Sequence, residues 1–236
     1  MRVVTIGLLA AAVTTAVAIL IPWLPAQESK EAERIDFVFW FVVAICIAVF
    51  AVVAAITVYS VVKFRVRPDD DSDGPPIHGH TGIEIVWTVI PTVLVTAIGI
   101  LSAVALAQNG KLESDRLKVN VTAQQFAWHF EYPQYGGLKS DELRLVEGRQ
   151  VDLSLRALDV IHSFFVPEFR QKQDAVPGIV TDLQITPTKA GTRTLICTEL
   201  CGLGHALMRA RVIVMKEDEF DSWARSQQQG SEGTSG

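Results

Sequence analysis

The sequence predicts a membrane-anchored all-β protein, with a hairpin of two transmembrane helices followed by a β-sandwich or barrel. Hydrophobic residues make up 49% of the 236 residues and charged residues only 20%, and the apolar excess lies in the first 108 residues. From Leu117 onward the chain changes to short stretches rich in β-branched and aromatic residues, separated by Gly and Pro. This pattern is typical of the strands and turns of a β-sandwich.

Residues 1–26 are expected to be a signal peptide or an extra N-terminal apolar segment. Arg2 precedes the uncharged run 3–21, which leads to two prolines and the small residue Ala26. A short basic start, an apolar stretch and a small-residue exit describe a secretory signal. The run is longer than the about 7–15 residues of a usual signal core. A third span that is not cleaved therefore remains an alternative.

Two uncharged runs within residues 27–109 predict the hairpin, with spans at about 37–62 and 85–107. At ~1.5 Å per residue, each run exceeds the ~30 Å hydrocarbon core of a bilayer. Basic residues follow the first span at once: Lys63, Arg65 and Arg67. By the positive-inside rule, the loop between the spans, with His78 and His80, is cytoplasmic. The chain after the second span is therefore expected on the outer side of a bacterial plasma membrane.

Residues 110–216 are expected to form an extracytoplasmic β-domain, and residues 217–236 a short helix and a disordered tail. The stretch from Glu217 to Ser226 is compatible with a helix, whereas the remaining residues, QQQGSEGTSG, have the composition of a disordered segment. The net charge of −5 argues against nucleic-acid binding, which usually requires a basic face.

The stretch CTELCGLGHALM, residues 197–208, holds the side chains best suited to chemistry. A disulfide between residues four apart is geometrically awkward and would leave His205 and Met208 unused. A structural zinc site prefers a closed set of Cys and His and has little use for a thioether. Methionine beside cysteine and imidazole favours copper. The spacing alone leaves the disulfide and zinc alternatives open.

The second cysteine bears on whether one copper or two would bind. A blue-copper site takes one Cys, two His and a weak axial Met. Two thiolates can instead bridge two coppers, with one imidazole on each, which requires a second histidine on the outer side. His129 is out of phase with its apolar neighbours in AWHFEY, which favours a position on the surface or just outside the ligand set. His162, in the apolar stretch DVIHSFFVP, is the better candidate.

The stretch DVIHSFFVPEFRQKQDAVPG, together with CTELCGLGHALM, resembles the CuA domain of subunit II of the haem–copper oxidases, the cytochrome c oxidases of bacterial type. The resemblance runs from about Arg34 to Val214 and includes HGHTGIEIVWTVIP at the start of the second span. Other CuA proteins, such as nitrous-oxide reductase, lack this hairpin. The resemblance implies a cupredoxin-like fold for the β-domain.

The resemblance also implies a function and a ligand set. Subunit II accepts electrons from a cytochrome c-like donor at a dinuclear copper centre and passes them to haem in subunit I. There, reduction of oxygen to water is coupled to proton pumping. Matched by position, the copper ligands are the bridging thiolates, two terminal imidazoles, an axial thioether and a backbone carbonyl: Cys197, Cys201, His162, His205, Met208 and Glu199. The Glu199 side chain would join a Mg²⁺ site shared with subunit I.

Three further residues acquire expected roles from the resemblance. Glu84 matches a glutamate near the mouth of a proton path into subunit I, although a carboxylate at a helix end is commonly just interfacial. Relatives carry Gln-Trp-Tyr-Trp where this chain has Gln-Phe-Ala-Trp. Phe126 and Trp128 are therefore candidates for the point where electrons enter, with carboxylates such as Asp174 around Phe126. The alternative is that both aromatic residues are ordinary strand residues.

The expected partners follow partly from the resemblance and partly from what the chain lacks. It has no Cys-x-x-Cys-His motif for covalent haem, so its electron donor is expected to be another protein. Subunit I, which carries the oxygen chemistry, subunit III and membrane lipid are the other expected partners. Three rival functions remain: a copper-free quinol-oxidase subunit, against which the two cysteines argue, a membrane-tethered copper carrier, and a purely structural module.

Overall fold

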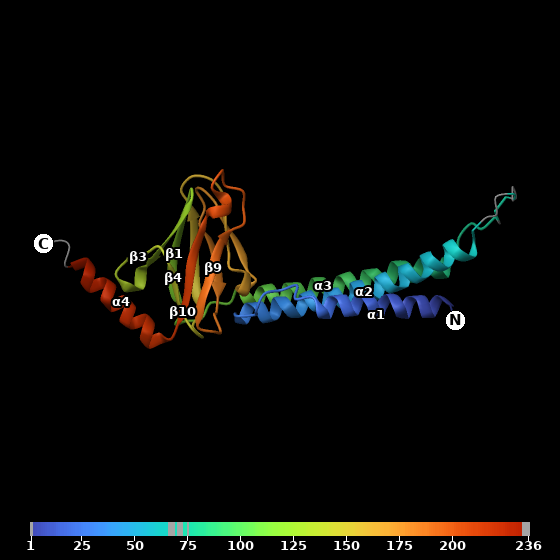
Figure 1. Cartoon of the computed structure of the whole chain (residues 1–236), viewed down its shortest axis with the longest axis horizontal. Helices are drawn as coiled ribbons and strands as arrows, with labels where there is room; N and C mark the ends of the chain where they lie inside the picture. Colours follow the sequence, from blue (N-terminus) through green and yellow to red (C-terminus); the bar gives the residue numbers. More distant parts are fainter. Residues whose placement is uncertain (1, 66–68, 70–72, 75, 233–236) are drawn as a thin grey trace. The chain divides into compact units, whose positions relative to one another are not determined.

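A computed structural model describes residues 2–65, 69, 73–74 and 76–232. The chain forms two compact units (Figure 1). One consists of Met1–Trp23 and Asp36–Val104, and the other of Leu24–Ile35 and Ala105–Gly236. Arg67, one of the basic residues used to predict a cytoplasmic loop, and part of that loop lie outside the described residues.

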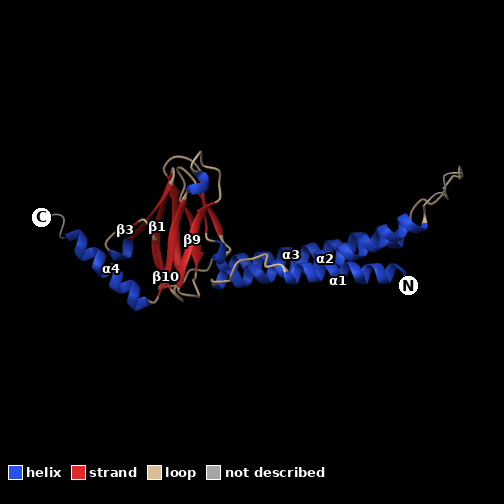
Figure 2. Ribbon diagram, viewed as in Figure 1, coloured by secondary structure: helices blue, strands red, loops and turns tan. Residues whose placement is uncertain are grey.

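Within the described residues, three helices are long and apolar enough to cross a membrane: α1 (Arg2–Leu20), α2 (Lys30–Lys63) and α3 (Thr81–Asn109). The prediction of a two-helix hairpin was therefore wrong in the number of helices, and the chain combines long helices with strands rather than being all-β (Figure 2). The reason lies in the length of the first apolar run. The 19 residues of α1 form one continuous helix, and at ~1.5 Å per residue it approaches the thickness of a bilayer core.

The second unit contains a β-sandwich of two five-stranded sheets, in the orders β3-β2-β1-β5-β8 and β4-β10-β9-β6-β7. β1 pairs with β5, and β10 with β4, in parallel, and the other pairs are antiparallel. The strands are β1 (Leu117–Gln124), β2 (Ala127–Tyr132), β3 (Leu138–Ser140), β4 (Leu143–Val146), β5 (Val151–Ala157), β6 (His162–Phe165), β7 (Lys172–Ala175), β8 (Thr181–Ile185), β9 (Gly191–Cys197) and β10 (Arg209–Met215).

Alternation along the strands builds one core between the sheets. In β1 and β5 every second residue is buried, as expected for strands with one face covered. The largest fully buried side chains are aromatic residues and leucines from both sheets, which include Trp128, Phe130, Tyr132, Phe164 and Leu153. This packed core supports the loops at the strand ends.

The register brings four segments to the same end of the sandwich. The parallel strands β1 and β5 both end there, so the turn 125–126 and the loop 158–161 are neighbours. In the other sheet, β6 begins and β9 ends at one place, because Phe164 is paired with Cys197. The loop 198–208 therefore starts beside His162. It contains one short 3₁₀ helix, His205–Leu207.

The C-terminal segment forms a longer helix than expected. α4 runs from Glu217 to Glu232, so the prediction of disorder from residue 227 was wrong up to Glu232, and the last four residues lie outside the described part. Phe220 and Trp223 place their rings 6.0 and 5.3 Å from that of Tyr132. Gln228 donates a hydrogen bond to the backbone oxygen of Tyr135 at 2.9 Å. These contacts hold a polar segment as a helix.

Residues 28–31, which we call the clasp, fasten the segment before α2 to the β-domain. The buried carboxylate of Glu28 pairs with buried Arg193 through two guanidinium nitrogens. The Glu31 carboxylate accepts hydrogen bonds from the backbone N–H and the hydroxyl of Thr186, at 2.8 and 2.9 Å. Ser29 caps α2 by accepting the N–H of Ala32 at 3.0 Å. The second unit is thus closed by residues at the junction between the segment that follows α1 and the first turn of α2.

Candidate metal centre

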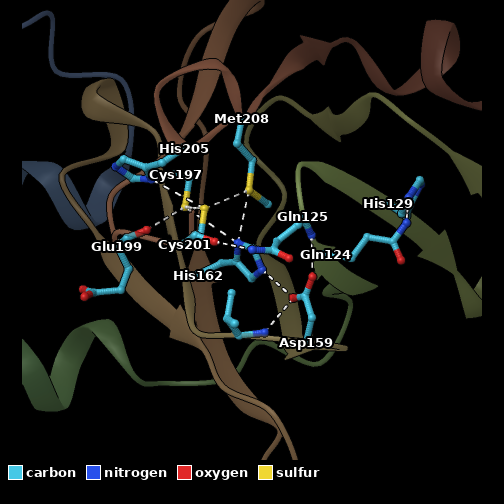
Figure 3. Close-up of polar contacts among 11 residues, drawn as sticks. Gln124, Gln125, His129, Asp159, His162, Cys197, Glu199, Cys201, His205 and Met208 are labelled. Atoms are coloured by element: carbon cyan, nitrogen blue, oxygen red, sulfur yellow. Dashed lines mark hydrogen bonds and ion pairs between the residues drawn. The ribbon is translucent and has the colours of Figure 1, made fainter. Parts of the chain in front are cut away.

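Two cysteines and a histidine meet at the loop end of the sandwich. His162 is the first residue of β6, Cys197 is the last residue of β9, and Cys201 lies in the loop that follows. All three are buried, and one ligand atom of each lies within 4.8 Å of the others (Figure 3). The two sulfurs are 3.9 Å apart and both thiols are free. A disulfide, with a bond of about 2.05 Å, is therefore absent from this pair.

The other three residues of the expected ligand set surround the same point. Met208 Sδ lies 3.1 Å from His162 Nδ1 and 3.8 Å from Cys201 Sγ. His205 Nδ1 lies 3.6 Å from Cys201 Sγ, and the backbone oxygen of Glu199 lies 3.3 Å from Cys197 Sγ. The Glu199 side chain itself is exposed. The fold thus gathers two thiols, two imidazoles, a thioether and a carbonyl, which suits copper better than zinc.

Burial and hydrogen bonding shift two pKa values at the centre. Burial, reinforced by neighbouring Cys197, raises the pKa of the Cys201 thiol to about 11. Partial burial of Asp159 raises the pKa of its carboxyl. Hydrogen bonds from His162 and from the backbone N–H groups of Gln125 and Val160 outweigh this effect and lower the pKa to about 2. Asp159 is therefore an ionised carboxylate that faces the imidazole of His162.

His129 lies away from this centre. Its Nδ1 is 2.9 Å from Asp141 Oδ1, its Nε2 is 3.3 Å from Gln124 Nε2, and the residue is exposed on β2. The phase of AWHFEY correctly indicated a surface position.

The two aromatic candidates have different surroundings. Phe126 is 40% exposed. Its ring covers the loop, since a Cβ on Gly204 would lie 2.5 Å from it and one on Gly202 3.2 Å. Trp128 is only 2% exposed, and its ring meets those of His162 and Phe164 edge-on, at 6.2 and 6.0 Å. Only Phe126 therefore offers a surface to a partner.

Asp174, the carboxylate expected near Phe126, has a hydrogen-bond partner on β6. Asp174 accepts a hydrogen bond from the hydroxyl of buried Ser163 at 2.6 Å. The residue between the two glycines under Phe126 is Leu203, which is fully exposed. An exposed apolar side chain therefore lies in the segment that Phe126 covers, and the carboxylates expected around Phe126 stay a prediction.

Glu84 lies in the first turn of α3, where it has a local structural partner. Its carboxylate accepts the backbone N–H of His80 at 3.1 Å, while His80 Nδ1 accepts the N–H of Ile83 at 3.3 Å. This reciprocal arrangement is a capping box shifted by one residue. The proton-path role of Glu84 stays a prediction.

Sequence reasoning missed Gln125 and Asp159, which hold the centre from outside. Gln125 donates to the backbone oxygen of Cys201 at 2.6 Å, and Asp159 lies 2.8 Å from His162 Nε2. The available signal was the position of Asp159 three residues before a candidate ligand, since ligand histidines commonly pair with a carboxylate.

Comparison with known proteins gives matches over both the apolar helices and the β-domain. Residues 16–104 match the family model described as the transmembrane domain of cytochrome c oxidase subunit II, and residues 138–218 match its periplasmic domain. The chain is 34% identical to cytochrome c oxidase subunit 2 of Thermostichus vulcanus, over 87% of this chain and 78% of the relative. It is 32% identical to the subunit 2 of Synechocystis, over 85% of this chain and 74% of the relative.

Among solved structures, the periplasmic domain of cytochrome oxidase subunit II from Bradyrhizobium japonicum matches with a TM-score of 0.48 and 26% identity. That match covers 51% of this chain and 99% of the other. The apolar helices and the His/Cys cluster suit a membrane-anchored metal-binding protein, and the matching family models and relatives are those of an oxidase subunit. The chain belongs to the cytochrome c oxidase subunit II family. Membership implies copper binding and an extracytoplasmic position for the β-domain.

Proposed function

We propose that this chain is the electron-accepting subunit of a terminal oxidase and that its copper centre is dinuclear. The observation that carries the proposal is the meeting of two buried thiols with His162, His205 and Met208 at one point. Two thiolates can bridge two metals, whereas a blue-copper site needs only one. Cys197 and Cys201 would bridge, the two imidazoles would be terminal ligands, and Met208 and the Glu199 carbonyl would be weak ligands.

A dinuclear copper centre with two sulfur bridges would supply one-electron transfer with the charge spread over two metals. The protein's part is to keep the ligands still. Cys197 and His162 are anchored at the ends of paired strands. Ligands held by a packed scaffold resist rearrangement when the charge changes.

The donor is a cytochrome c-like protein that meets the exposed ring of Phe126. This ring lies on Gly204, the residue directly before the candidate ligand His205. Trp128, which is buried against His162, supports the imidazole from inside the core. Electrons would leave for haem in subunit I, which reduces oxygen to water and pumps protons.

The remaining parts of the proposal concern partners and location. The exposed carboxylate of Glu199 would join a Mg²⁺ site shared with subunit I. Glu84 would lie at the mouth of a proton path, on the cytoplasmic side of α3. The assembly, with subunit III, would lie in the bacterial plasma membrane, with the β-domain outside.

The test is the copper content and the EPR spectrum of the full-length chain in detergent. We expect two coppers per chain, a purple absorption, and hyperfine coupling spread over two equivalent nuclei. Cys197→Ser and Cys201→Ser should each abolish this signal, because each removes a bridge. Met208→Leu should keep both coppers and move the reduction potential, since a weak axial ligand tunes more than it holds.

A single copper with four-line coupling in a fully loaded sample would contradict the dinuclear centre. Ready release of copper to a chelator would favour a membrane-tethered copper carrier instead. The full chain is required because Arg193 is buried against Glu28, and a fragment starting after α3 would lack that partner.

A further inference from the structure

The turn between β1 and β2 contacts the loop that carries Cys201. Gln125 lies in this turn, and its side-chain Nε2 donates a hydrogen bond to the backbone oxygen of Cys201 at 2.6 Å. The amide also packs closely on the loop, because a Cβ added to Gly202 would lie 2.8 Å from Nε2. Cys201 is therefore fixed from the turn as well as from its own loop.

The backbone of the same residue acts on His162. The N–H of Gln125 donates to Asp159 Oδ2 at 2.7 Å, and the N–H of Val160 donates to Oδ1 at 2.7 Å. Oδ1 also lies 2.8 Å from His162 Nε2. The carboxylate therefore holds the imidazole by one ring nitrogen, while the other, Nδ1, lies 3.1 Å from Met208 Sδ on the side of the candidate ligands.

We propose that Gln125 is a positioning residue of the copper centre. Its amide holds Cys201 while its backbone N–H holds Asp159 and thereby His162, so one residue fixes the separation of a ligand in a loop from a ligand at the start of a strand. The inference rests on the proposed function. Partners that hold metal ligands from outside tune both affinity and potential.

The test compares Gln125→Met with Gln124→Met in the full-length chain loaded with copper. Methionine has nearly the length of glutamine but no N–H to donate, and the backbone bond to Asp159 remains. Gln124 is the matched control, since its side chain lies 3.3 Å from His129 and away from the centre. In Gln125→Met we expect copper retention against a chelator to fall about 10-fold or more. The reduction potential and the EPR hyperfine pattern should also shift, and Gln124→Met should match the parent.

Parent-like copper retention, potential and spectrum in Gln125→Met would overturn the inference, even if the melting temperature fell, because the role would then be only structural. Should this variant not fold, Gln125→Asn, which keeps an amide too short to reach Cys201, takes its place with the same expectations. If both fail to fold while Gln124→Met folds, the residue serves the turn itself and the inference is overturned. A parent that does not bind two coppers would instead contradict the proposed function, before any variant is compared.

Discussion

Phe126 is the residue whose side chain links the surface to the loop 198–208, which carries four of the candidate copper ligands. Its exposed ring covers Gly202 and Gly204. Phe126→Ala should therefore lower the second-order rate of copper reduction by a cytochrome c about 10-fold, since central aromatic contacts at interfaces are commonly worth over 1 kcal/mol. The copper spectrum should stay unchanged. Stopped-flow reduction at low and moderate salt measures this rate.

Leu112→Ala is the matched control for this experiment. Leu112 is 55% exposed and precedes β1, at the opposite end of that strand from Phe126, so its removal should leave the rate unchanged. If Phe126→Ala reduces as fast as the parent at both salt concentrations, electrons enter elsewhere. Equal losses in both variants would indicate a general apolar effect instead of a contact centred on Phe126.

Trp128 should affect stability more than electron transfer. It is 2% exposed, and its indole N–H has no hydrogen-bond partner among the described residues. Trp128→Phe therefore removes packing but no hydrogen bond, and we expect a loss of about 1–3 kcal/mol of unfolding free energy. Thermal or denaturant unfolding of the copper-loaded chain measures it. A parent-like midpoint together with slowed reduction would show that Trp128 belongs to the electron path.

Individual site residues could be predicted from the sequence where they lie close together along the chain. The set from Cys197 to Met208 lies within one loop, so its spacing indicated a metal before any fold was known. Gln125 and Asp159 could not be placed in this way. Their contact joins residues 34 apart and depends on the parallel register of β1 and β5, which no local pattern specifies.

At the scale of elements, two variants of Glu84 at the start of α3 can distinguish its role as a helix cap from a role in proton transfer. Glu84→Gln keeps an oxygen that can accept the His80 N–H but cannot carry a proton. We expect oxygen consumption of the assembled oxidase to slow severalfold, while copper reduction is unchanged. Glu84→Ala, which also removes the cap, should cost about 0.5–2 kcal/mol of local helix stability in addition.

Normal oxygen consumption in Glu84→Gln would leave Glu84 as a helix cap at the membrane surface. Slowing in Glu84→Ala alone would assign the effect to the cap. The comparison is made on the whole oxidase, because a proton path into subunit I cannot be measured in this chain alone.

The ends of the chain show why elements were harder to predict than the central strands. The tail QQQGSEGTSG has a composition typical of disorder, yet α4 continues to Glu232, with Gln228 bonded to the backbone of Tyr135. Tertiary contacts overrode composition there. The strands of the β-domain were recognisable because each alternates over one shared core, a signal that the sequence carries locally.

At the scale of the whole molecule, the clasp is expected to be a major source of stability for the β-domain. Side chains of Glu28 and Arg193 are only 9% and 5% exposed. Removing one partner from such a buried pair typically costs about 3–5 kcal/mol, because the other charge stays buried alone. We expect Glu28→Ala to lower the unfolding free energy of the β-domain by this amount, measured in the full chain by the loss of the copper absorption with denaturant.

Lys189→Ala is the control for this prediction. Lys189 also contacts Glu28, at 3.5 Å, but its side chain is 70% exposed, and exposed pairs contribute about 0–1 kcal/mol. A loss in Lys189→Ala as large as in Glu28→Ala would mean that net charge, rather than the buried pair, stabilises the domain.

The clasp also sets an order of events during synthesis. Glu28 and Arg193 are 165 residues apart in the chain, so the ribosome completes the early partner long before the late one. If the β-domain lies outside the membrane, the pair can close only after most of that domain has been translocated. Insertion of the long apolar helices would come first and closure of the outer domain last. An interrupted export event would then leave an anchored but open domain, which quality-control proteases can recognise.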